Sequence, residues 1–192
     1  TAKVVYAASV GNWIMRHEPE IWARTAKYVM LPTYLNYKLT GNLIDSASNQ
    51  IGHIPFDYKN RRWMKPGSLT RCFCDVPNEK LCDLVPSGTV IGTVTDEVCA
   101  LTGIPAGLPL ISTGSDKGCE TLGLAVVDSD KASISLGTTA TIQFSTTEYV
   151  EPQQFLPAYP GVLNDHYNPE IEIYRGLWLL SWFVKEFGTA DA

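Results

Sequence analysis

The spacing of hydrophobic residues predicts helices in the first part of the chain. Apolar residues recur at helical intervals in residues 4–17, 20–27 and 31–39. Pro19 suits the start of the second helix, and Gly41 suits the end of the third. Three consecutive helices are therefore expected before residue 42.

Short apolar runs and alternating patterns predict strands further along. Residues 90–94 and 108–111 are apolar runs too short for helices. Residues 132–136 and 140–144 alternate and flank a tight turn, Gly137-Thr138-Thr139. The remaining predicted elements are helices at residues 78–84, 96–102, 117–125 and 177–187 and a strand at residues 172–176. This mixture of elements predicts an α/β protein.

A carboxylate stands where α/β proteins commonly bind their ligands. Asp116 follows the strand expected at residues 108–111, and either Ser115 or Asp116 can cap the next helix. The residue thus lies at the carboxyl end of a strand and at the positive N-terminus of a helix. Asp116 is a candidate catalytic residue, and a plain helix cap is the alternative.

The predicted turn between residues 136 and 140 offers a different chemistry. Gly137, Thr138 and Thr139 would present backbone N–H groups and two hydroxyls at one point, which suits a phosphate group. A hairpin turn without any ligand has the same composition. Only the order and spacing of this turn relative to Asp116 favour a functional interpretation.

The stretch TGSDKGCETLGLAVVDSDKASISLGTTATI resembles the centre of the FGGY carbohydrate kinases, the family of glycerol kinase and xylulokinase. The resemblance implies an RNase H-like fold of the actin and Hsp70 type. It makes Asp116 the general base toward a sugar or polyol hydroxyl. It places Gly137, Thr138 and Thr139 at the phosphates of ATP, with Mg²⁺ as the accompanying ion. A small-molecule sugar or polyol and ATP are thus the implied partners.

Lys117 follows the base, at a position where relatives often carry Gln or Asn for a substrate hydroxyl. Its charge favours an acidic or differently placed polyol, or its side chain points to solvent; both interpretations stay open. Arg175 and Gly176 precede a Trp-containing helix that looks like the part of the second FGGY domain near the nucleotide. The alternative is that residues 177–187 form a helix packed in the core.

The helical lead-in also resembles the family, in Trp13-Ile14, in the sequence Leu39-Thr40-Gly41 and in the Asp45 region. Many members carry a Lys where this chain has Val10, so substrate contacts there are doubtful. Tyr6 and Asn12 are candidate substrate contacts, and a plain helix surface is the alternative.

The resemblance divides the chain at the junction between two domains. Residues 1–127 would be the later part of the first domain, on the substrate side, and residues 128–192 the start of the second, on the nucleotide side. The chain starts with Thr1 and lacks the family's Asp-x-Gly-Thr hairpin, so we expect an internal piece that is inactive alone. A non-catalytic scaffold that binds sugar or nucleotide with the same fold is the alternative function.

Composition excludes several other classes. A formal net charge of −5 argues against nucleic acid and anionic membranes as partners. No run of 18 apolar residues occurs, so no membrane span is expected, and we expect a cytoplasmic protein. The cysteine and histidine spacings match no metal site, and no G-x-G-x-x-G run supports a dinucleotide-binding oxidoreductase. We therefore assign no metal ligand, and we leave a homodimer open.

Overall fold

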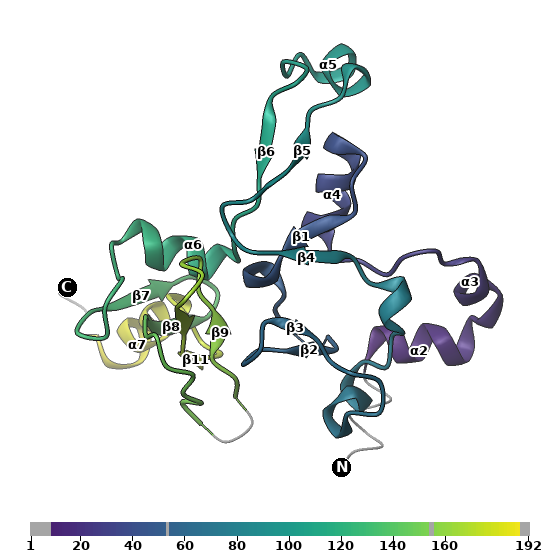
Figure 1. Ribbon diagram of the computed structural model, residues 1–192. Coiled ribbons are helices and arrows are strands. Elements are labelled where there is room, and N and C mark those ends of the chain that lie inside the picture. The colour runs from purple at the N-terminus through teal and green to yellow at the C-terminus, as the bar shows by residue number, and fades with distance from the viewer. Residues whose placement is uncertain (1–8, 53, 154–155, 189–192) are drawn as a thin grey trace. The chain divides into compact units, whose positions relative to one another are not determined.

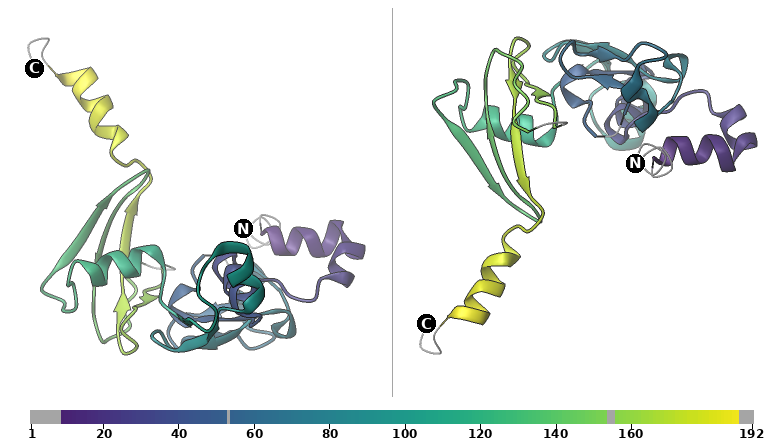
Figure 2. Two further views of the ribbon diagram at one scale, coloured as in Figure 1. Left: turned by 90° about the horizontal axis from the view of Figure 1, so that it is seen from above. Right: turned by 90° about the horizontal axis from the view of Figure 1, so that it is seen from below.

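The computed structural model describes residues 9–52, 54–153 and 156–188 (Figure 1). The chain forms two compact units, one ending at Ser115 and one beginning at Asp116. Each has helices and small sheets of its own, as further views show (Figure 2). The domain boundary expected between residues 127 and 128 stays a prediction, because compact units within part of a fold need not coincide with its domains.

Three helices open the first unit, as predicted: α2 (Val10–His17), α3 (Pro19–Arg24) and α4 (Leu31–Thr40). The Ser9 side chain accepts a hydrogen bond from the Asn12 N–H and caps α2. Gly41 ends α4 in the left-handed conformation, at φ 78°. Residues 4–8 of the first predicted helix, with Tyr6, lie outside the described residues.

The first unit holds three two-stranded sheets. Strands β5 (Val90–Thr93) and β6 (Pro109–Ile111) pair antiparallel, and helix α5 (Asp96–Thr102) connects them. The Thr95 hydroxyl accepts from the Val98 N–H at the start of α5, and Gly103 ends it with φ 79°. These elements confirm the prediction for residues 90–111. The other two sheets are the hairpin of β2 (Phe56–Asp57) and β3 (Arg62–Trp63), and the parallel pair of β1 (Ile44–Ser46) and β4 (Asp83–Val85).

The helix predicted at residues 78–84 is wrong. Only the short 3-10 helix η3 (Asn78–Lys80) forms, and the chain then enters β4. β4 pairs parallel with β1, with Ile44 opposite Asp83. Leu81 and Cys82 are buried just before this pairing begins. Burial and long-range strand pairing thus override the local helical spacing.

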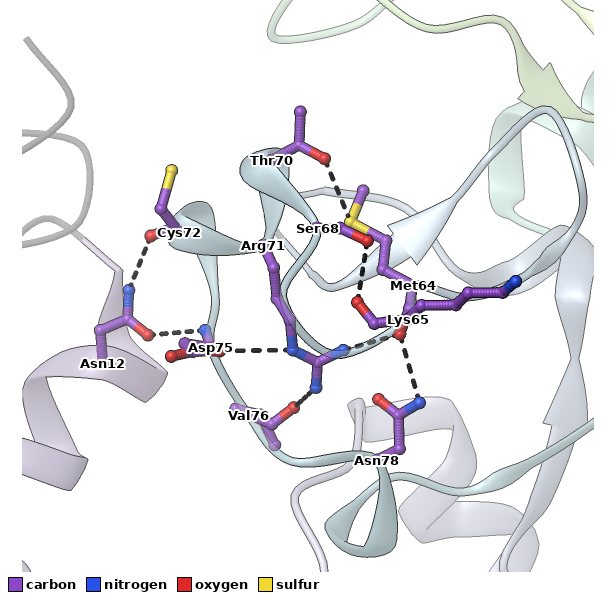
Figure 3. Close-up of polar contacts among 10 residues, drawn as sticks. All are labelled: Asn12, Met64, Lys65, Ser68, Thr70, Arg71, Cys72, Asp75, Val76 and Asn78. Carbon is purple, nitrogen blue, oxygen red and sulfur yellow. Dashed lines mark hydrogen bonds and ion pairs between the residues drawn. The ribbon is translucent and has the colours of Figure 1, made fainter.

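Buried polar groups join the loops of the first unit to its helices (Figure 3). Arg71, in the 3-10 helix η2 (Leu69–Phe73), is 4% exposed, and its guanidinium donates to the carbonyl oxygens of Met64 and Val76. Its Nε lies 3.3 Å from Asp75 Oδ1. This arginine fixes the loop beside a small apolar core of Cys74, Val76 and Leu81, against which Trp22, Tyr28 and Trp63 pack.

The second unit is built on a three-stranded antiparallel sheet. β7 (Ala132–Leu136) and β8 (Ala140–Phe144) form the predicted hairpin. β11 (Glu170–Ile173) pairs with the other edge of β8. It starts two residues before the predicted strand. A small ribbon of β9 (Tyr159–Pro160) and β10 (Tyr167–Asn168) lies in the sequence between β8 and β11.

Helix α6 (Asp116–Gly123) packs on one face of this sheet (Figure 2). It ends before the predicted residue 125, because Ala125 takes the left-handed conformation with φ 57°. The sheet side chains beneath it are polar and buried or half-buried: Ser133, Ser135, Thr141, Gln143 and Glu170. The contact between α6 and the sheet is therefore made largely by hydrogen bonds.

Apolar side chains are exposed elsewhere in the second unit. The opposite face of the sheet carries five aliphatic residues that are 42–65% exposed: Ile134, Leu136, Ile142, Ile171 and Ile173. Helix α7 (Trp178–Phe187) has no buried residue either. The helix predicted at residues 177–187 is confirmed, and the alternative that it packs in a core stays a prediction, because the described residues leave it exposed.

Candidate active site

Asp116 is the first residue of α6 and is exposed. The backbone N–H of Lys117 donates to its Oδ1 over 2.7 Å. The start of a helix carries a positive partial charge that stabilises a carboxylate. The arrangement gives an accessible acceptor for a proton at the position that the sequence indicated.

The Lys117 side chain crosses from α6 to the sheet. Its Nζ lies 2.7 Å from Ser135 Oγ on β7 and 3.0 Å from Glu120 Oε2 one turn along the helix. The side chain is 27% exposed. The ammonium group is thus held by protein groups and does not extend freely into solvent.

A chain of buried hydrogen bonds continues beneath α6. The hydroxyls of Thr121 and Ser133 are 2.9 Å apart, and the Thr121 hydroxyl also donates to Gln143 Oε1. Gln143 Nε2 then donates to Glu170 Oε2 over 3.0 Å. Because hydrogen bonds are directional, these contacts fix both the rotation and the position of α6 on the sheet.

Glu170 is the partly buried acidic group of this layer. Burial raises the pKa of its carboxyl, and the hydrogen bond from Gln143 opposes that shift. The charges of Glu172 and Asp116 raise the pKa further, whereas Lys117 lowers it. The Asp116 carboxylate at the start of α6 is thus close enough to β11 to raise the pKa of Glu170.

The predicted phosphate turn connects β7 to β8. The Gly137 N–H donates to the Thr139 carbonyl oxygen over 2.9 Å, which closes the turn. Within the described ranges, no backbone hydrogen bond starts from the N–H of Thr138 or Thr139, and neither hydroxyl has a protein partner. Four hydrogen-bond donors are therefore available at this tip of the sheet.

Gly176 lies directly against this turn. Its N–H donates to the Thr138 carbonyl oxygen over 2.9 Å, and the N–H of Leu177 donates to the Gly137 carbonyl oxygen over 3.0 Å. A Cβ atom on Gly176 would lie 1.9 Å from the Gly137 oxygen. The close approach requires glycine at this position, because any side chain would overlap the turn.

Arg175 precedes this contact and is exposed. Its guanidinium carbon lies 4.7 Å from the centre of the Trp178 ring, a cation–π arrangement on the first turn of α7. The positive charge of Arg175, the residue directly before Gly176, is thus held over the Trp178 ring.

The structure brings some predicted site residues together and leaves others apart. Gly137 and Thr138 contact Gly176, and Lys117 contacts β7, the strand that leads into the turn. In the described part of the chain, no hydrogen bond joins Asp116 to the turn. Sequence reasoning missed Ser135, Gln143 and Glu170. Along the strands these polar residues alternate with aliphatic residues in the sequence, and that alternation was the signal that could have found them.

Asn12 is not a substrate contact in this structure. The side chain is fully buried, its Nδ2 donates to the Cys72 carbonyl oxygen, and its Oδ1 accepts from the Asp75 N–H (Figure 3). It joins α2 to the loop around Arg71. Both the substrate role and the plain helix surface considered for Asn12 are therefore wrong.

Neither a metal cluster nor a membrane-spanning helix occurs among the described residues. Residues 9–52, 54–153 and 156–188 contain no group of three or more His, Cys, Asp or Glu side chains placed to hold a metal ion. None of the helices in these ranges combines the length and apolar character that a bilayer span requires.

Solved structures share this fold. The chain aligns with the ligand-bound xylulose kinase from Lactobacillus acidophilus at a TM-score of 0.79 and 20% identity, over 99% of this chain and 40% of that one. The expected α/β class is confirmed: the chain has the actin-like ATPase fold. The sequence narrows this class further, because residues 1–123 match the family model described as "FGGY family of carbohydrate kinases, N-terminal domain". The chain belongs to the FGGY family of carbohydrate kinases.

Curated relatives agree with this family. The sugar kinase YgcE from Escherichia coli (strain K12) is 33% identical over 158 residues, which are 82% of this chain and 32% of the relative. The xylulose kinase of the same strain is 28% identical over 181 residues, 93% of this chain and 36% of the relative. The chain thus spans about a third of the length of the relatives that it matches.

Proposed function

We propose that the protein catalyses ATP-dependent phosphorylation of a hydroxyl group on a sugar or polyol. The observation that carries this proposal is the family match over residues 1–123, which includes the exposed carboxylate of Asp116 at the start of α6. We also propose that the 192 residues do not complete the site by themselves, since they span about a third of the matched relatives.

Asp116 is proposed as the general base. A base must be accessible to the acceptor hydroxyl and must be held in place. The exposed position at the start of α6 supports the first requirement, and the polar layer beneath the helix supports the second. In this role the carboxylate would orient the hydroxyl and take its proton as the new oxygen–phosphorus bond forms, while the bond between the γ-phosphorus and the ADP oxygen breaks and ADP leaves.

The turn of Gly137, Thr138 and Thr139 is proposed to bind the phosphates of ATP. Its two N–H groups and two hydroxyls without protein partners fit phosphate oxygens, which are acceptors only. Gly176 contacts the turn and Arg175 precedes it in the chain, and both are proposed to border the same site. ATP supplies the phosphoryl group, and Mg²⁺ neutralises part of its charge.

Mg²⁺ is proposed to accompany ATP, and we assign it no protein ligand. This ion commonly keeps several waters and uses one or two carboxylates together with the phosphates. We place the proposed activity in the cytoplasm, where ATP and phosphorylated sugars are used, and we keep residues 128–192 as the start of the nucleotide-side domain.

A phosphoryl-transfer screen of the full-length protein tests this proposal. Pentoses, hexoses, ketoses and polyols are offered with Mg-ATP, and ADP formation is measured. We expect turnover with at least one substrate and a loss of about 10³-fold or more in kcat for Asp116→Asn, as expected when a general base and its orienting role are both removed.

The matched control is Asp128→Asn. Asp128 is 65% exposed and pairs only loosely with Lys131, at 3.7 Å, so its loss is expected to leave kcat within twofold. Binding of sugar and Mg-ATP without turnover by the wild-type protein would instead support the non-catalytic scaffold. Full activity of Asp116→Asn would refute the assignment of the base.

A further inference from the structure

We propose that Lys117 is a positioning residue that fixes Asp116 relative to strand β7, and that its ammonium group does not contact the sugar. This inference rests on the proposed function, because it concerns the residue next to the proposed base. It resolves the two alternatives for Lys117, a substrate contact or a solvent-exposed charge, in favour of a third role.

The contacts of Lys117 carry the inference. The Nζ atom donates to Ser135 Oγ over 2.7 Å and lies 3.0 Å from Glu120 Oε2. Ser135 is two residues before Gly137, where the proposed phosphate turn begins. The ammonium group therefore connects the helix end that bears the base to the strand that leads into the turn.

The interface between α6 and the sheet explains why such a connection matters. Thr121 contacts Ser133 and Gln143 one turn further along the helix. These hydrogen bonds fix the middle of α6, and Lys117 adds the contact nearest to Asp116. Without Lys117, the first turn of the helix would lose the side-chain bond to Ser135 on the sheet, and helix ends that lose such bonds tend to fray.

Charge gives a second reason for a cation at residue 117. The carboxylates on the elements around it are Asp116 and Glu120 on α6, and Glu170 and Glu172 on β11. The charge of Asp116 acts unfavourably on ionised Glu170, whereas Lys117 acts favourably. Lys117 thus offsets repulsion among these carboxylates, in addition to its geometric role.

Substitutions in the full-length protein test the inference. Lys117→Met removes both contacts, and Ser135→Ala removes only the oxygen on β7. We expect Lys117→Met to lower kcat at least about tenfold, because misplacement by an ångström near the chemistry can cost up to ~10²-fold. The KM for the sugar should stay within twofold.

A double-mutant cycle separates positioning from substrate contact. If Lys117 acts through Ser135, the double variant should have a kcat within about twofold of Lys117→Met, since both changes break one connection. Lys131→Met is the matched control, because Lys131 is 53% exposed and forms only a loose surface pair; its kcat should be unchanged.

Three results would overturn the inference: a raised KM for the sugar at unchanged kcat in Lys117→Met, effects of the two substitutions on kcat that simply multiply, or wild-type kcat in Ser135→Ala. The last result remains informative even if Lys117→Met does not fold. Failure of the proposed function is distinguished by the wild-type protein, which would then show no turnover, and failure of the base assignment by Asp116→Asn, which would then retain activity.

Discussion

The contact between Gly176 and the β7–β8 turn gives a sharp prediction for Gly176→Ala. The new Cβ would lie 1.9 Å from the Gly137 oxygen and 2.7 Å from the carbonyl carbon and oxygen of Thr138. Contacts of Cβ atoms below 3.0 Å essentially do not occur, so the turn or the start of α7 must move by at least about 1.1 Å. That displacement breaks both hydrogen bonds between the two segments.

The magnitude follows from these contacts. Two backbone hydrogen bonds contribute about 0.5–1.5 kcal/mol each, and relief of overpacking costs roughly 1–3 kcal/mol. We expect Gly176→Ala to lower the free energy of unfolding of the second unit by about 2–6 kcal/mol. Urea denaturation measures this change, and hydrogen exchange of residues 132–144 should show faster opening of the hairpin.

Two other glycines serve as controls for this prediction. Gly123, in α6, has no atom within 4 Å of an added Cβ, so Gly123→Ala should be neutral or stabilising by up to about 1 kcal/mol. In Gly137→Ala the nearest atom would be the Thr139 oxygen at 3.9 Å, which also allows folding. If phosphate binds to the turn, however, Gly137→Ala should raise the KM for ATP without a loss of stability. Wild-type stability and exchange in Gly176→Ala would refute the argument that this contact holds the turn.

Two further predictions concern buried charge. Arg71→Met should lower the free energy of unfolding of the first unit by about 3–5 kcal/mol, measured in urea, because carbonyl oxygens and a carboxylate lose a buried partner. Arg62→Met removes one member of an exposed ion pair and should change this free energy by less than about 1 kcal/mol. Equal effects of the two substitutions would contradict the anchoring role of Arg71. The pKa of Glu170 is raised in the folded state, so the native protein binds more protons, and stability should fall as pH rises from about 4.5 through the raised pKa. Glu170→Gln should flatten this part of the stability–pH profile, and an unchanged slope would show that Glu170 is not its source.

Local sequence signals determined much of the fold. Helices α4 and α5 begin and end close to where their spacing and their glycines at residues 41 and 103 predict, because capping depends on only a few neighbouring residues. The β7–β8 hairpin was likewise predictable, since alternation and a short turn fix its register. Asp116 could be singled out because a strand end and a helix start meet there in the sequence itself.

Other features depended on contacts between residues far apart in the chain. β4 exists because residues 83–85 pair with residues 44–46, and the local helical spacing near Leu81 gave no sign of that pairing. The exposure of α7 likewise contradicts its apolar sequence, since a hydrophobic pattern says that a face can be buried and does not say what covers it.

The candidate site shows the same division. Residue type alone singled out Asp116 and the Gly137–Thr139 turn as candidates, because the chemistry proposed for them would depend on single side chains and on a local backbone conformation. Only the tertiary structure placed Gly176 against that turn and Lys117 against Ser135, since both contacts join separate elements. Sequence therefore determined which groups can carry the chemistry, and packing determined which residues hold them in position.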